Sequence, residues 1–92
     1  MPQHKLEKKV SSRRTRFEII AEILRLGKAR RTKIMYSCDL SFRQLDRYLA
    51  QLCDQGYLTV TPEDKKRFYC TTEKGRKLLE RIDQVLEMLG EG

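Results

Sequence analysis

Residues 40–58 of this 92-residue chain, LSFRQLDRYLAQLCDQGYL, decide its fold. Ser41 followed three positions later by Gln44 is the pattern of a capping box, and Gly56 is a signal for a helix end. The leucines between them recur at the spacing of one helical face. That face consists of Leu45, Leu49 and Leu52. The stretch therefore predicts a helix from Phe42 to about Asp54 with its leucines turned inward.

The opposite face of this predicted helix is polar and basic. Arg and Gln side chains carry the donors that read guanine and adenine edges in the DNA major groove, and a helix N-terminus favours phosphate. We expect bases to be read by Arg43, Gln44 and Arg47. Ser41 and Gln51 complete the DNA-binding residues expected on this helix. The alternative is an ordinary solvated face, which most surface helices have.

Two helices are expected before this one. Apolar residues recur at helical spacing from Thr15 to Leu26, and a shorter helix from Arg30 to Ser37 turns Ile34 inward. The inward face expected on the first helix consists of Phe17, Ile20, Ala21 and Leu24. A second apolar face consists of Ile19, Ile23 and Leu26. Because a helix that is apolar on two sides needs two partners, we expect this second face to contact another chain.

A β-hairpin is expected after residue 56. Tyr57 to Thr61 and Phe68 to Thr71 are rich in Tyr, Phe, Val and Thr, and residues 62–67 between them form a polar turn. Three cations in this turn are expected to touch phosphate. They are Lys65, Lys66 and Arg67. The alternative is a charged turn that resists edge-to-edge aggregation.

The C-terminal segment predicts a last helix that begins after Thr72. It carries an apolar stripe that suits a helix partner. The homodimer interface expected from both apolar faces consists of Ile19, Ile23, Leu26, Leu78, Ile82, Val85, Leu86 and Leu89. The alternative is a stripe that only closes the core of the single chain.

The amino-acid composition narrows the range of functions that the chain could have. The chain carries 20 Lys and Arg against 13 Asp and Glu, a net charge of +7, with an isoelectric point near 9.6, which favours a polyanionic partner. Three scattered cysteines and one histidine, His4, form neither a disulfide framework nor a metal or nucleophile pair. We expect a protein that is not an enzyme and that uses no cofactor or metal; no small-molecule ligand is evident in the sequence, which leaves an effector ligand open.

No apolar run reaches the roughly 20 residues that span a bilayer, so we expect no membrane association and a cytoplasmic, nucleoid-associated location. The expected organisation is a flexible basic arm in residues 1–14, a DNA-binding domain in residues 15–72 and a dimerisation helix in residues 73–92. The class is mainly α with a β-hairpin wing (α+β). Three helices, a hairpin and a final helix are the order of a winged helix-turn-helix.

The run from Arg31 to Glu80 resembles the small archaeal winged-helix regulators. It shares with them the RTKIMY opening of the second helix, the Leu-Ser entry to the third, and the TEKG start of the last. The resemblance implies a transcriptional regulator or chromatin-associated protein whose last helix pairs with the same helix of a second copy of the chain. It places Arg31 and Lys33 on the second helix and Arg43, Gln44 and Arg47 on the recognition helix.

The sequence thus predicts a protein that binds double-stranded DNA as a homodimer and regulates transcription. It leaves open a winged helix that binds proteins and a factor that compacts DNA generally. RNA binding is a further alternative, for which only Phe68 and Tyr69 would supply a stacking platform.

Overall fold

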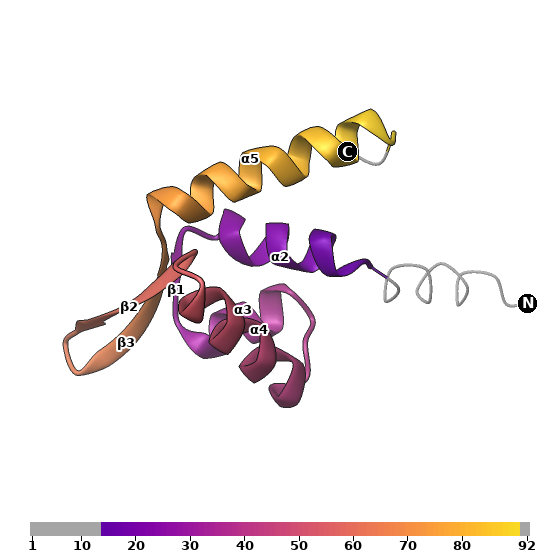
Figure 1. Cartoon of the computed structure of the whole chain (residues 1–92). Helices are drawn as coiled ribbons and strands as arrows, with labels where there is room; N and C mark the ends of the chain where they lie inside the picture. Colours follow the sequence, from indigo (N-terminus) through magenta and orange to yellow (C-terminus); the bar gives the residue numbers. More distant parts are fainter. Residues whose placement is uncertain (1–13, 91–92) are drawn as a thin grey trace, which may run out of the picture.

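The computed structural model describes residues 14–90, which form four helices and a three-stranded sheet (Figure 1). The elements in chain order are α2 (Arg16–Arg25), β1 (Lys28–Ala29), α3 (Arg31–Ser37), α4 (Phe42–Asp54), β2 (Leu58–Glu63), β3 (Lys66–Thr71) and α5 (Glu73–Met88). The expected winged helix-turn-helix order is confirmed. The arm expected in residues 1–14 lies, except for Arg14, outside the described residues.

Helix α4 begins and ends where the sequence predicts. The Ser41 hydroxyl accepts a hydrogen bond from the Gln44 amide at 3.2 Å, and the Gln44 side chain accepts one from the Ser41 amide at 3.0 Å. The leucine face is buried, with Leu45 fully inaccessible. It shares one core cluster with Ile23 of α2, Ile34 of α3 and Leu58 of β2. Helix α4 is therefore fixed through one face by three neighbouring elements.

The hairpin is longer and tighter than expected. The two strands pair from Leu58 with Thr71 to Glu63 with Lys66, so the turn has two residues, Asp64 and Lys65. Both have positive φ, 50° and 66°, as in the turns that match the twist of hairpin strands. The prediction of a turn over residues 62–67 is wrong because Pro62 lies on an edge strand, where its missing N–H costs no ladder bond.

A third strand, β1, was not predicted. Its two residues pair antiparallel with β3, Lys28 opposite Cys70 and Ala29 opposite Tyr69, which gives the sheet order β1-β3-β2. Gly27 just before it has φ of 77°, a conformation that glycine adopts freely, and its carbonyl accepts from the Thr71 amide at 2.7 Å. This short strand ties the end of α2 to the hairpin.

The two apolar faces of α2 are used differently from the prediction. Ile19 and Ile23 are buried in the core of the single chain at 8% and 2% exposure, whereas Phe17 is 63% exposed. The prediction that Ile19 and Ile23 contact a second chain is therefore corrected, because the side chains already pack within the core. The prediction that Phe17 points inward is also wrong.

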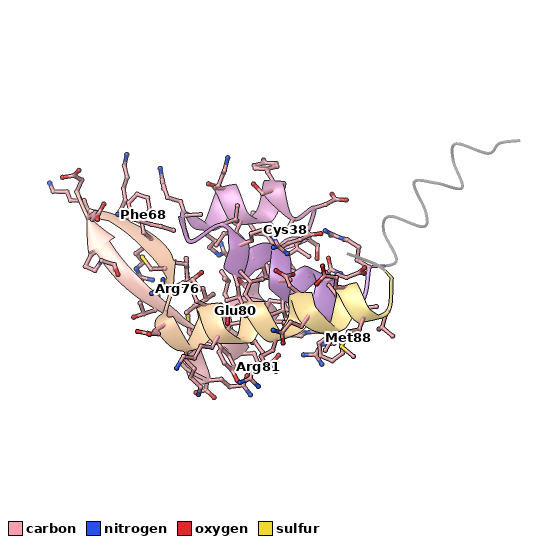
Figure 2. All side chains as sticks on the ribbon, turned by 90° about the horizontal axis from the view of Figure 1, so that it is seen from above. Cys38, Phe68, Arg76, Glu80, Arg81 and Met88 are labelled. Atoms are coloured by element: carbon pink, nitrogen blue, oxygen red, sulfur yellow. The ribbon has the colours of Figure 1, made fainter. Side chains whose placement is uncertain are left out.

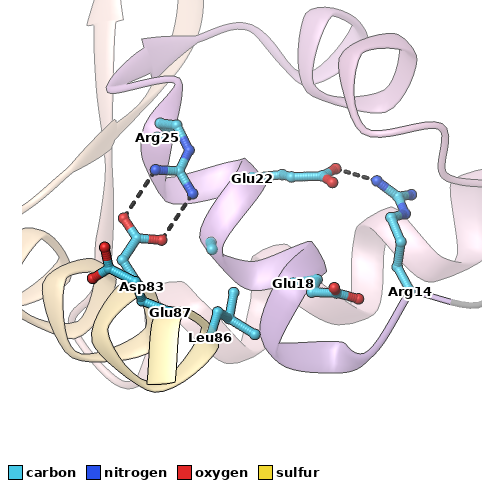
Figure 3. A pocket seen from close by; sticks show the side chains of 8 residues that line it. Arg14, Glu18, Glu22, Arg25, Asp83, Leu86 and Glu87 are labelled. Carbon is cyan, nitrogen blue, oxygen red and sulfur yellow. Dashed lines mark hydrogen bonds and ion pairs between the residues drawn. The ribbon is translucent and has the colours of Figure 1, made fainter. Parts of the chain in front are cut away.

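Helix α5 packs along α2, side by side in Figure 1. Its Ile82 is buried at 6% exposure, so this member of the predicted dimer stripe also belongs to the single chain's own core. Arg25 donates two hydrogen bonds of 3.0 Å to the Asp83 carboxylate, which lower the pKa of Asp83 (Figure 3). Arg14 pairs with Glu22 at the other side of the same pocket. These contacts fix the direction in which α5 leaves the hairpin.

The three cysteines are free thiols, as the sequence predicts. Cys38 is buried, and burial raises the pKa of its thiol to about 11. Burial also raises the pKa of the Cys53 thiol. The Cys70 thiol lies 3.6 Å from the Thr61 hydroxyl in the hairpin.

Gly75 allows α5 to approach the hairpin. A Cβ at this position would overlap the Tyr57 carbonyl oxygen and lie 2.9 Å from the Thr71 methyl group. Gly75→Ala should therefore lower the free energy of unfolding by about 1 to 3 kcal/mol, the usual cost of overpacking a core. Urea unfolding followed by circular dichroism measures this loss. Glu80→Ala, on the exposed side of the same helix, is the control, and equal midpoints for the two variants would contradict the prediction.

Candidate nucleic-acid interface

The exposed face of α4 carries two arginines, Arg43 and Arg47. Neither makes an ion pair within residues 14–90. They lie on the side of the helix opposite the leucine face, so fixing the leucines also fixes the direction in which both guanidinium groups project. The structure thus brings together the two strongest candidates for base contact.

The other polar residues predicted on α4 are already engaged. Ser41 and Gln44 hydrogen-bond each other's backbone in the capping box, which leaves the Gln44 NH₂ group as its outward donor. The side-chain amide oxygen of Gln51 accepts a 2.9 Å hydrogen bond from the Arg16 guanidinium. Each glutamine therefore presents amide hydrogens, which suit an acceptor such as guanine O6 or a phosphate oxygen.

Sequence reasoning missed Arg16. This first residue of α2 lies beside α4 and lines a cleft of about 490 Å³ together with Gln44, Arg47, Tyr48 and Gln51. Its neighbours in the sequence have other roles, because Arg14 forms an ion pair and Thr15 caps α2. Nothing in the position of Arg16 in the sequence indicates that it contacts Gln51, which lies 35 positions further along the chain.

Arg31 is held by α4. Its guanidinium pairs with the Asp46 carboxylate and lies 5.3 Å from the centre of the Phe42 ring. Both partners lie on the flank of α4 that faces α3. The predicted phosphate contact of Arg31 is therefore occupied within the chain, whereas Lys33, two residues further along α3, is exposed.

The hairpin supplies a second group of cations. Lys65 in the turn and Lys66 and Arg67 in β3 are exposed, as predicted. Lys28 of β1 reaches the Glu63 carboxylate at 2.6 Å and lies 5.0 Å from the centre of the Phe68 ring. The hydrogen bond to Glu63 raises the pKa of Lys28. Figure 2 shows Phe68 on the hairpin, away from Arg81 and Met88 of α5.

The family model that matches this chain is described as a winged helix-turn-helix, and the match covers residues 13–90. The chain belongs to this family. The archaeal resemblance found in the sequence is confirmed by two uncharacterised proteins of Methanocaldococcus jannaschii. One is 31% identical over 84% of this chain and 78% of its own length. The other is 33% identical over 86% of this chain, which spans only 37% of that longer relative.

Solved structures agree with the family. Sso10a-2, a DNA-binding protein from Sulfolobus solfataricus, superposes with a TM-score of 0.76 at 29% identity over 84% of this chain and 83% of its own. A MarR family transcriptional regulator from Silicibacter pomeroyi superposes with a TM-score of 0.67 at 20% identity, over 78% of this chain and 50% of the regulator, and shares the fold. Within the described residues no helix could cross a membrane, and no cluster of side chains has the makings of a metal site.

Replacing Asp46 by Asn should raise the affinity for duplex DNA. The change removes a negative charge from α4 and releases Arg31, so we expect a three- to tenfold gain, roughly, at low salt and a log-log salt slope steeper by about 1 per subunit. The pair is exposed, so its loss should cost about 1 kcal/mol of stability or less. A salt titration by fluorescence anisotropy measures both quantities. Asp54→Asn, which removes the same charge from α4 without releasing Arg31, should leave the slope unchanged, and equal slopes for the two variants would contradict the assignment.

Proposed function

We propose that this protein binds double-stranded DNA as a homodimer and regulates transcription, with α4 in the major groove and the hairpin against the backbone. The observation that carries the proposal is the pair of exposed arginines on a helix that is capped and locked by its leucine face. A rigid helix can place Arg43 and Arg47 against base edges, whereas a mobile one would lose that precision.

The hairpin cations support the backbone contact. Lys65, Lys66 and Arg67 sit at the tip of a two-stranded ribbon whose turn holds only two residues, so they project beyond the body of the domain. Contacts of this kind position a protein on DNA and carry no sequence information. Among the relatives, the DNA-binding protein Sso10a-2 supports the choice of DNA over a protein partner.

General DNA compaction is the second candidate. The side-chain N–H groups of Gln44 and Gln51 can donate to phosphate oxygens as readily as to guanine edges, which favours binding with little sequence preference. The two candidates differ in what Arg43 and Arg47 contact, and this difference is measurable.

A homodimer is supported by an apolar patch at the end of α5. The patch surrounds a cavity of about 290 Å³ and is formed by Phe17, Ile82, Val85, Leu86 and Leu89. Three of these side chains are more than half exposed, Phe17, Val85 and Leu89. Apolar groups this exposed and this close together favour association. Of the predicted interface, Val85, Leu86 and Leu89 line this patch, and Phe17 takes the place of Ile19 and Ile23. Leu26 and Leu78 are partly buried against the core of the single chain.

The charges of α5 favour a second copy as the occupant. Its first half carries an excess of cations, with Lys74, Arg76, Lys77 and Arg81 against Glu73 and Glu80. From Ile82 to Met88 it carries Asp83 and Glu87 and no cation. Two α5 helices that cross antiparallel would place these halves against each other, so the patch and its charged surroundings complement themselves.

Alanine at Arg43 or Arg47 should separate base reading from phosphate contact. On a duplex selected from a random pool we expect a loss of about 1 to 3 kcal/mol, and on random duplex a much smaller one, because a bidentate guanine contact contributes this much to discrimination. Binding is measured at several salt concentrations, with Lys77→Ala on α5 as the control. Equal losses on both duplexes would favour compaction over sequence reading, and absence of duplex binding by the unchanged protein would overturn the proposal.

Glutamate at both Val85 and Leu89 should give a monomer, because charges in an apolar interface are costly to bury. Multi-angle light scattering should then report a mass near the 10.9 kDa of a single chain, against twice that value for the unchanged protein. Both side chains are exposed in the single chain, so circular dichroism should remain unchanged. Gln84→Glu adds one negative charge at an exposed position of the same helix outside the patch and should stay dimeric. A dimer mass for the double variant would rule out this interface.

A further inference from the structure

A cleft between α3 and the hairpin has no part in the proposed reading face. It measures about 530 Å³ and is lined by residues of β1, α3 and β3. β1 and α3 follow each other in the sequence, and the pairing of β1 with β3 brings Phe68 of the hairpin beside them. The reading arginines Arg43 and Arg47 do not line it. A volume of this size could accommodate a nucleotide.

One solvent-exposed aromatic ring lines this cleft. Tyr36 is 78% exposed, whereas Tyr48, Tyr57 and Tyr69, the other tyrosines of the chain, are all partly buried. Its neighbour Ile34 supplies the inward contact of α3, so the packing of α3 does not require the Tyr36 ring. An exposed ring at the wall of a cleft offers a flat surface on which a base can stack.

The cations around the ring suit a phosphate. Lys28, Arg30 and Lys33 line the cleft, and no carboxylate does. Lys28 lies over the Phe68 ring and pairs with the Glu63 carboxylate. Arg30 and Lys33 make no ion pair within the described part of the chain. Two of the three charges are therefore uncompensated, which leaves the cleft net positive.

We propose that this cleft binds an unpaired nucleotide, with its base stacked on Tyr36 and its phosphate held by Arg30, Lys33 and Lys28. The combination of a positively charged groove with an exposed aromatic ring is the one by which proteins bind single-stranded nucleic acid without sequence preference. A duplex backbone contact would need the cations alone, because paired bases are stacked within the helix and do not reach an aromatic side chain. The exposed ring therefore favours a single strand over a duplex.

This site goes beyond the proposed duplex-binding function and does not depend on it. A protein with both sites would bind a duplex through α4 and a displaced or unpaired strand through the cleft. RNA and DNA share the base and phosphate on which the site acts, so the cleft alone does not distinguish them.

The test uses the full chain and three probes at low salt: fluorescein-labelled dodecathymidylate, a blunt duplex of 12 base pairs, and adenosine monophosphate as a competitor. Tyr36→Ala should weaken binding of the single strand by about 5- to 100-fold, the effect of losing one base-aromatic stack. Tyr36→Phe keeps the ring and should bind within about twofold of the unchanged protein. The duplex affinity of both variants should stay within the same limit.

Arg47→Ala provides the reciprocal control when the 12-base-pair duplex carries a site selected from the random pool, since it should weaken binding of that duplex and leave the single strand unaffected. If adenosine monophosphate at millimolar concentration displaces the strand, the site also accepts a free nucleotide. If it does not, the site binds only a strand, and the stack on Tyr36 is supported by the Tyr36→Ala result in both cases. Equal binding of the single strand by Tyr36→Ala and the unchanged protein would overturn the proposal. So would an equal loss on the duplex, because the cleft would then be part of the duplex interface. Failure of the unchanged protein to bind duplex would remove the proposed function and leave this result standing.

Discussion

Burial of the leucine face of α4 is the constraint on which the rest of the structure depends. Leu45 is fully inaccessible, and the same cluster takes in side chains from α2, α3 and β2, so these elements share one core with α4. A helix locked through one face presents the opposite face at a fixed angle. The capping box sets where α4 begins and therefore which residues reach that outer face. Core packing and the direction of Arg43 and Arg47 are thus two results of the same interaction.

Ion pairs decide which cations remain to face a partner. Arg14, Arg25, Lys28 and Arg31 each lie against a carboxylate within the described residues. Such partly exposed pairs contribute about 1 kcal/mol or less to stability, so their main effect is to cancel charge locally. The net charge of +7 is consequently uneven over the surface. The uncompensated part includes the outer face of α4, the hairpin tip and the cleft beside Tyr36.

The apolar surface is divided in a similar way between the core and the outside. Ile19, Ile23 and Ile82 complete the interior of one chain, and Phe17, Val85 and Leu89 stay exposed where the start of α2 meets the end of α5. The packing of α5 along α2, beside which Arg25 pairs with Asp83, assembles this patch. The patch, the reading face and the Tyr36 cleft have different linings, so each can be altered without changing the others.

The sequence by itself determined the elements whose signals are local. Periodicity and caps predicted α4 to the residue and the order of helices and hairpin, because a capping box and a helical face are encoded within a few neighbouring positions. Only the tertiary structure decided which of the two apolar faces of α2 enters the core, since both have the right period and burial depends on what packs against them. It also decided that β1 pairs with β3, that Arg31 is held by Asp46 while Arg16 joins the recognition helix, and that Tyr36 faces the hairpin. These are contacts between residues distant in the chain, and no local pattern records them.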